Sequence, residues 1–201
     1  MAYKIVLASS SPRRKELLET VGIKFEVINP SAEETVIRDE TPEEFALRVS
    51  IEKASSVSRR LKEDRVVVGA DTIVVMDGEI LGKPSDEAEA ALMLNKISGR
   101  EHRVLTAFSI LRPQDEVLHS EIVATRVRVK PLAAHEIEGY IKTGEPMDKA
   151  GAYGIQGVGS FMVREIEGSY TNVVGLPLVE LLQAFRNLGI FELFSVDGCK
   201  K

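Results

Sequence analysis

The chain has 201 residues, a formal net charge of −5 at pH 7, and a composition that is 44% apolar and 28% charged. These values are typical of a globular protein, and the length fits one large domain or two small lobes around a shared sheet. The apolar runs are too short to span a bilayer, which excludes a membrane-spanning protein. The negative charge and the lack of tryptophan argue against a nucleic-acid surface, so we expect the important basic residues to form local clusters.

Residues 1–7 combine one lysine with a short apolar run that leads into a helix signal, so they indicate a first strand and not a secretion signal. We therefore expect a cytoplasmic protein. The single cysteine, Cys199, can form no disulfide within the chain, and no cysteine-rich metal site is available. We predict one domain of two lobes over residues 1–189, followed by a tail at 190–201.

Strand and helix signals alternate along the chain without a low-complexity linker or a fixed repeat. Strands are predicted at 4–8, 25–28, 65–76, 79–81, 102–112, 117–129 and 159–166. Helices are predicted from Pro12 to Gly22, from Pro42 to about Leu61, from Asp86 to near Gly99, at 135–142 and at 177–188. This order predicts an α/β protein with a central sheet.

Local signals fix several of these boundaries. Ser11-Pro12 supplies an N-cap and an N1 proline, and Thr41 to Glu44 has the pattern of a capping box. Asp77-Gly78 predicts a tight turn between the long strand at 65–76 and the short one at 79–81.

Three distant segments carry the chemical signal: residues 7–14, residues 70–84 and residues 148–157. Each places cations, a carboxylate or free backbone amides at the end of a strand or the start of a helix. Polyphosphates and their metal ions are held at such positions. The three segments together therefore predict one nucleotide site.

Asp71 lies inside a strand of valines and isoleucines that is otherwise suited to complete burial. A buried carboxylate must be paired, metal-bound or protonated, because desolvating an isolated charge is very costly. One interpretation is an aspartate that binds neighbouring backbone amides. The other is a catalytic or metal-binding carboxylate, which the neighbouring motifs favour.

Four cations are likewise open to a structural and a functional interpretation. Lys53 interrupts the apolar stripe of its helix and either reaches solvent or meets a bound polyphosphate. Lys83, between Gly82 and Pro84, is either a solvated loop lysine or a cation aimed by a stiff loop. Arg13 and Arg14 occupy the first turn of a helix, where cations are unfavourable unless an anion is bound or the side chains project into solvent.

The remaining candidate metal ligands give weak signals. Glu33-Glu34 is either a magnesium-binding pair or a solvated acidic loop. His102, His119 and His135 lie on separate elements without ligand spacing, so we interpret them as structural or surface residues.

The ordered set Ser-x-Ser-Pro-Arg-Arg, Glu-Glu, Glu-Lys-Ala, Gly-Ala-Asp-Thr, Gly-Lys-Pro and Lys-Ala-Gly-Ala-Tyr-Gly-Ile-Gln-Gly resembles the Maf family of nucleoside triphosphate pyrophosphatases. The resemblance covers Ile5 to about Leu188. It implies an inosine triphosphate pyrophosphatase-like (Maf/Ham1) fold, in which a long curved mixed sheet divides two lobes around a central cleft. It also implies a cytoplasmic homodimer that cleaves the α–β phosphoanhydride bond with a divalent metal, Mg²⁺ or Mn²⁺.

The resemblance assigns roles to particular residues. It implies that Asp71 is the catalytic base and that Ser9, Arg14, Glu34, Lys53 and Lys83 line the phosphate and metal site. We expect Asp71 to activate the attacking water and Glu34 and Asp71 to hold the metal, although the sequence does not separate the two roles of Asp71. Arg14, Lys53 and Lys83 are expected to neutralise the leaving pyrophosphate.

Substrate selection is expected at Arg13, Thr72 and Gln156, which match the branch of the family that acts on dTTP, UTP and modified uridine triphosphates. The 7-methyl-GTP branch carries Trp, Gln and Glu at these positions. Gln156 offers a donor and an acceptor that complement the O4 and N3–H edge of thymine or uracil. Two alternatives remain: a 7-methyl-GTP enzyme, and a nucleotide-binding inhibitor of septum formation that acts through a partner.

Overall fold

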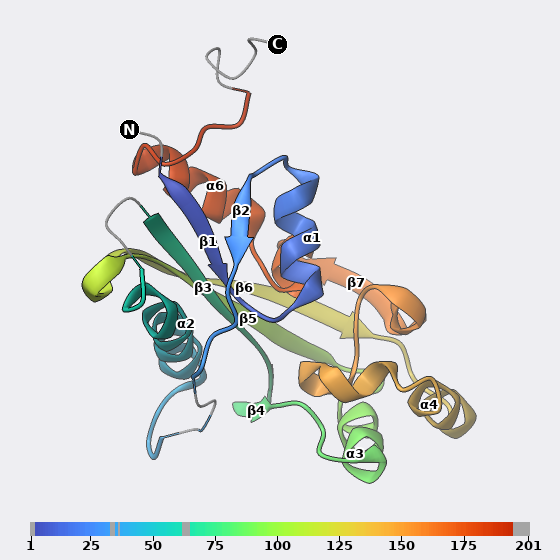
Figure 1. Ribbon diagram of the computed structural model, residues 1–201. Helices are drawn as coiled ribbons and strands as arrows, with labels where there is room; N and C mark the ends of the chain where they lie inside the picture. The colour runs from blue at the N-terminus through green and yellow to red at the C-terminus, as the bar shows by residue number, and fades with distance from the viewer. Residues whose placement is uncertain (1–2, 33–34, 36, 62–64, 195–201) are drawn as a thin grey trace.

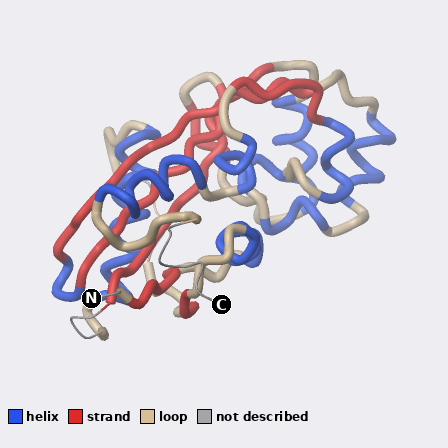
Figure 2. Tube along the Cα trace, turned by 90° about the horizontal axis from the view of Figure 1, so that it is seen from above, coloured by secondary structure: helices blue, strands red, loops and turns tan. Residues whose placement is uncertain are grey.

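The computed structural model describes residues 3–32, 35, 37–61 and 65–194. Its core is a mixed sheet of seven strands in the order β2-β1-β3-β5-β6-β7, with β4 paired to β3. The strands are β1 (Lys4–Ala8), β2 (Phe25–Val27), β3 (Arg65–Met76), β4 (Glu79–Leu81), β5 (Glu101–Arg112), β6 (Glu116–Val129) and β7 (Val163–Glu167). The pairs β1–β2 and β1–β3 are parallel, and the others are antiparallel. Figure 2 shows the strands as one twisted band with helices along it.

Helices cover both faces of this sheet. The helices are α1 (Pro12–Thr20), α2 (Pro42–Ser58), α3 (Glu87–Ile97), α4 (Ala134–Ile141), α5 (Tyr170–Val174) and α6 (Leu178–Asn187). Short 3₁₀ turns occupy Pro113–Asp115, Glu145–Asp148, Ala150–Ala152 and Gly157–Met162. No helix in the described part of the chain is long and apolar enough to cross a membrane.

Alternate side chains along β3 point to opposite faces of the sheet, so they pack in separate hydrophobic cores. Odd positions such as Val67 and Val75 pack beneath α2. On the even face, Val66 and Val68 pack with α1 and α6, whereas Val74 packs with α3 and α4. Figure 1 shows α1 and α6 toward one end of the sheet and α3 and α4 toward the other, so the even face carries two lobes.

Helix α2 begins at the predicted capping box. The amide of Glu44 donates to the Thr41 hydroxyl at 3.2 Å, and the Thr41 amide donates to the Glu44 carboxylate at 2.9 Å. The helix packs directly on β3, because a Cβ at Gly69 would lie 2.3 Å from the Ser50 carbonyl oxygen and 2.7 Å from the Ala54 nitrogen. Only glycine permits this approach, which brings Lys53 over the centre of β3.

Most predicted elements are confirmed, including β3 at residues 65–76 and its hairpin with β4. Two boundaries are wrong: α2 ends at Ser58 and not near Leu61, and the strand predicted at 159–166 is a 3₁₀ turn over Gly157–Met162 followed by β7. The amides of Val158 and Gly159 bind the Glu145 carboxylate, so they do not join a strand ladder. Helix α5 was not predicted from the sequence.

The residues directly after α6 pack in the core of the lobe that contains α1 and α6. Ile190 is 8% exposed and packs in the same cluster as Phe185, whose carbonyl oxygen accepts a hydrogen bond from the Ile190 amide at 2.9 Å. The domain boundary at residue 189 stays a prediction. Most of the predicted tail, residues 195–201, lies outside the described residues.

Candidate active site

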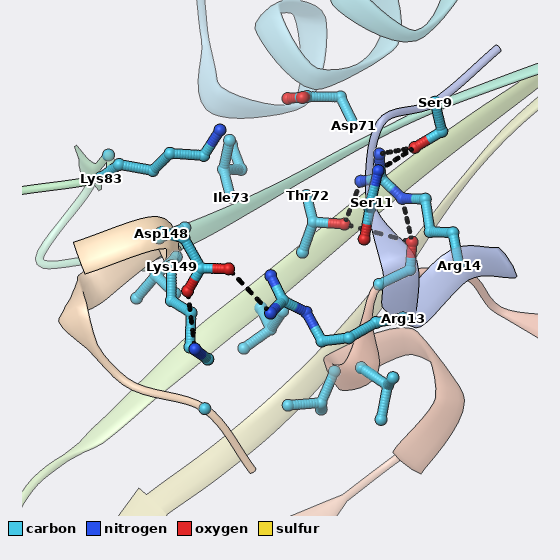
Figure 3. A pocket seen from close by; sticks show the side chains of 18 of the residues that line it. Ser9, Ser11, Arg13, Arg14, Asp71, Thr72, Ile73, Lys83, Asp148 and Lys149 are labelled. Atoms are coloured by element: carbon cyan, nitrogen blue, oxygen red, sulfur yellow. Dashed lines mark hydrogen bonds and ion pairs between the residues drawn. The ribbon is translucent and has the colours of Figure 1, made fainter. Parts of the chain in front are cut away.

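The three segments identified in the sequence meet in one cleft of about 680 Å³. Residues 9–14 come from the end of β1 and the start of α1, residues 71–74 from β3, residues 82 and 83 from the loop after β4, and residues 148–156 from the turns after α4. Figure 3 shows side chains from these segments pointing toward one another. The predicted convergence is therefore observed.

The cleft lies where β3 changes its neighbour. The parallel pairing with β1 ends at Gly69, and the antiparallel pairing with β4 begins at Val74. Asp71 and Thr72 lie between these pairings and line the cleft. In α/β proteins, ligands bind at such switches of strand order, beyond the carboxyl ends of parallel strands.

Asp71 forms a buried ion pair on the α2 face of β3. The Lys53 ammonium donates to Asp71 Oδ1 at 2.7 Å, and the two side chains are 9% and 7% exposed. Of the states open to a buried carboxylate, the structure shows pairing, and the partner, Lys53, was not predicted from the sequence. Lys53 thus satisfies the buried carboxylate, and Asp71 at the same time lines the cleft.

Arg14 is held on the opposite face of β3. It is 8% exposed, and its guanidinium donates to the Gly175 carbonyl at 2.7 Å, to the Thr72 hydroxyl at 2.9 Å and to the Ser9 hydroxyl at 3.3 Å. The Ser9 hydroxyl also accepts the Ser11 amide at 3.2 Å. Arg14 is therefore locked in a fixed orientation at the N-terminus of α1, where the helix dipole adds positive potential.

Thr72 extends this polar network to β5 and α5. Its hydroxyl lies 3.0 Å from that of Thr106, which donates to the Asn172 carbonyl at 2.9 Å. The Asn172 amide group in turn donates to Thr125 at 2.9 Å and to the Val104 carbonyl at 3.1 Å. Thr72 thus has a structural role beside the predicted role in specificity.

Arg13 reaches across the cleft. Its guanidinium donates to Asp148 Oδ2 at 3.1 Å, and the Lys149 ammonium donates to Asp148 Oδ1 at 2.6 Å, as Figure 3 shows. Burial opposes ionisation of Asp148, but Lys149 and Arg13 outweigh it and lower the pKa of the carboxyl. Asp148 and Lys149 belong to the predicted segment 148–157, but neither was assigned an individual role from the sequence.

Lys83 lies on an exposed loop between β4 and α3. Figure 3 shows its side chain extending into the cleft toward Asp71. The loop is fixed by the Gly151 amide, which donates to the Gly82 carbonyl at 2.9 Å. The stiff loop expected from Gly82 and Pro84 is thus also tied to the 3₁₀ turn across the cleft.

Gln156 lines the cleft from the turn segment, which we define as residues 144–160. Tyr153 lies beside it and is anchored from behind, because its hydroxyl is 2.7 Å from His102 Nε2. Burial lowers the pKa of His102 to about 4, and burial raises the pKa of Tyr153, so both groups are neutral near pH 7. His102 is structural, one of the two roles expected from the sequence. Tyr153 belongs to the predicted segment 148–157, but no individual role was assigned to it from the sequence.

The described residues contain no group of three or more Asp, Glu, His or Cys side chains that could hold a metal ion by themselves. Magnesium commonly takes one or two carboxylates and completes its shell with substrate phosphates and water. Asp71 at the cleft fits such a role as a single protein ligand. Glu34, the second predicted ligand, lies outside the described residues.

These features define an α/β protein with a cleft at a strand switch, in which arginine and lysine side chains surround one buried carboxylate. The solved structure of the Staphylococcus aureus Ham1 protein has the same fold, with a TM-score of 0.51 and 19% identity over 92% of this chain and 99% of that one. This likeness confirms the predicted fold class.

The chain belongs to the Maf-like protein family, which matches residues 4–188. It is 50% identical over 188 residues to a protein of Geotalea uraniireducens (strain Rf4) named dTTP/UTP pyrophosphatase, a match that covers 94% of this chain and 96% of the relative. A Clostridioides difficile (strain 630) protein of the same name is 46% identical over 190 residues, which cover 93% and 97% of the two chains.

Proposed function

We propose that this protein is a dTTP/UTP pyrophosphatase, which hydrolyses the α–β phosphoanhydride bond and releases a nucleoside monophosphate and pyrophosphate. The family and the names of relatives that match almost the whole chain support this function. The structural observation that supports it most directly is the position of Asp71 in the cleft. Lys53 donates a hydrogen bond to Asp71, Arg14 donates one to the neighbouring Thr72, and Figure 3 shows Lys83 directed toward Asp71.

In the proposed reaction, Asp71 takes a proton from a water molecule that attacks the α-phosphorus. The new P–O bond forms as the α–β P–O bond breaks in line, and the electron pair leaves with pyrophosphate. Arg14, Lys53 and Lys83 stabilise the charge that develops on the leaving group, with Ser9 as a further donor. Fixed cations lower the barrier because they need no reorganisation during the reaction.

A divalent metal, Mg²⁺ or Mn²⁺, would be held by Asp71, by Glu34 and by phosphate oxygens. When bound, it supplies positive charge that polarises the phosphate and offsets its repulsion of the nucleophile. We therefore expect hydrolysis to stop in excess chelator and to return when Mg²⁺ or Mn²⁺ is added back. Hydrolysis that continues in chelator would contradict this part of the proposal.

Base selection is proposed for Gln156, with Arg13 and Thr72 shaping the pocket. All three residues line the same cleft. A primary amide can donate to O4 and accept from N3–H of thymine or uracil, whereas a glutamate, which only accepts, would suit the N–H donors of a guanine edge.

The direct test is a screen of the purified protein against a panel of nucleoside triphosphates, in which pyrophosphate release is measured. We expect kcat/KM for dTTP and UTP to exceed that for ATP, GTP and 7-methyl-GTP. A preference for 7-methyl-GTP would overturn the branch assignment and leave the pyrophosphatase assignment intact. The proposed homodimer can be checked on the same sample by light scattering.

A further inference from the structure

The part of the turn segment that carries Gln156 is held from behind by one carboxylate. Glu145 Oε2 accepts the Val158 amide at 2.9 Å, and Glu145 Oε1 accepts the Gly159 amide at 3.0 Å. Both donors are backbone groups two and three residues beyond Gln156. The Val158 side chain is 54% exposed, so the backbone contacts and not side-chain packing fix this side of the loop.

The other side of the loop is fixed by Tyr140. The Gly154 amide, two residues before Gln156, donates to the Tyr140 hydroxyl at 3.2 Å. That hydroxyl donates to Glu145 Oε1 at 2.9 Å, and the Tyr140 side chain is 2% exposed. Glu145 and Tyr140 are therefore one connected unit that binds the backbone on both sides of Gln156.

Two glycines allow the backbone to lie directly on this unit. Gly157 has φ of +68°, and a Cβ there would lie 2.7 Å from Glu145 Oε2. A Cβ at Gly159 would lie 2.6 Å from the Tyr140 hydroxyl. The contact is thus too close for any other residue, which leaves little freedom in the position of the peptide groups around Gln156.

Glu145 is ionised in this arrangement. Burial opposes its charge, but the amides of Gly159 and Val158 and the Tyr140 hydroxyl outweigh burial and lower the pKa of the carboxyl. A carboxylate that accepts several such bonds is a strong fixed acceptor. Its main-chain carbonyl is also bound, because the Lys149 ammonium donates to it at 2.6 Å.

We propose that Glu145, together with Tyr140, is a positioning residue for base selection: it holds the backbone of residues 154–159 so that the Gln156 amide faces the base of a pyrimidine nucleoside triphosphate. This inference rests on the proposed function. It assigns Glu145 no contact with the substrate and no part in bond cleavage. Its effect reaches the substrate through Gln156.

The test is Glu145→Gln, with Glu138→Gln on the exposed side of α4 as the matched control. The two amides bind different oxygens of Glu145, so in either orientation the new NH₂ group faces a backbone donor. We expect kcat/KM for dTTP and UTP to fall about tenfold, mainly through KM, while the value for ATP changes less than about twofold. Glu138→Gln should behave like the wild type.

A double variant separates positioning from a general structural effect. In a Gln156→Ala background, Glu145→Gln should cause no further loss of the dTTP/ATP ratio, because the residue through which it acts is already absent. Tyr140→Phe, which removes only the hydroxyl, should lower the ratio about threefold. This variant replaces Glu145→Gln as the test if Glu145→Gln does not fold.

The outcomes are distinct. An equal loss for every nucleotide, or an undiminished loss in the Gln156→Ala background, would overturn the positioning role and leave the proposed function standing. A wild-type protein that does not prefer dTTP and UTP over ATP would contradict the proposed function and this inference together.

Discussion

The two walls of the cleft are built in different ways. The first, which we call the sheet wall, consists of β3 with the start of α1 and the part of α2 that packs on it, and its proposed catalytic side chains Arg14, Lys53 and Asp71 are each less than 10% exposed. The second is the turn segment, residues 144–160, which is made of 3₁₀ turns and whose backbone amides around Gln156 are held by side chains. From this difference we expect the sheet wall to serve bond cleavage and the turn segment to serve substrate selection.

The physical reason is that regular elements and turns position side chains in different ways. Regular elements fix buried charges within a rigid, low-dielectric environment, where electrostatic stabilisation of a transition state is strongest. A turn stabilised by backbone hydrogen bonds can vary in side chains while its path stays constant. Substitutions in the sheet wall should therefore change kcat for all substrates, and substitutions in the turn segment should change the ranking of substrates.

The largest expected effect comes from Asp71→Asn. The amide has the same size, but it can neither accept a proton nor carry the charge, so kcat should fall at least about a hundredfold for every nucleotide. The matched control is Asp77→Asn, an exposed aspartate in the turn after β3 with φ of +55°, a conformation that asparagine tolerates. Near-normal turnover of folded Asp71→Asn would end the assignment.

Lys53→Met tests the sheet wall through stability. Removing the cation from a buried ion pair leaves the Asp71 carboxylate without the partner at 2.7 Å, so the free energy of unfolding should fall by about 3 kcal/mol. The double variant Lys53→Met/Asp71→Asn should recover part of this loss, because no buried charge remains. Urea unfolding measures both effects, and a double variant less stable than the single one would show that the pair is not the cause.

Gln156→Glu tests the turn segment. A carboxylate cannot donate to O4 of the base, so kcat/KM for dTTP should fall by about tenfold to a hundredfold, which corresponds to roughly 1–3 kcal/mol. Inhibition by pyrophosphate should change little, because the proposed phosphate-binding residues lie in the other wall. If the dTTP preference is unchanged, then the base is recognised elsewhere.

The smallest effect is expected from the pH dependence of stability at His102, which supports Tyr153. Its pKa in the folded protein is about 4, below the ordinary value of 6.5, so the unfolded chain binds more protons between these values. Stability from this residue is therefore complete above pH 6.5 and is lost as the pH falls toward 4. Between about pH 7 and 5.5 the loss should be about 1 kcal/mol, and it should disappear in His102→Gln but not in His135→Gln, the control for an exposed histidine.

The accuracy of the elements predicted from the sequence also differs between the two walls. In the sheet wall, local signals were strong: the β-branched run 65–76, the capping box at Thr41 and the turn at Asp77-Gly78 all lie in the predicted elements. In the turn segment, the predicted strand at 159–166 was partly wrong. Glycines and short polar residues allow several local conformations there, and contacts with Glu145 and Tyr140 select one of them.

The sequence by itself determined the α/β class, the burial of Asp71 and the three segments that meet in the cleft, because these follow from periodicity, from helix and turn signals and from the cost of burying a charge. Only the tertiary structure decided which partners the charges take. Lys53 meets Asp71 because α2 packs on Gly69, and Arg13 meets Asp148 across 135 residues of chain. Such pairings depend on how elements pack in space, which local sequence patterns do not encode.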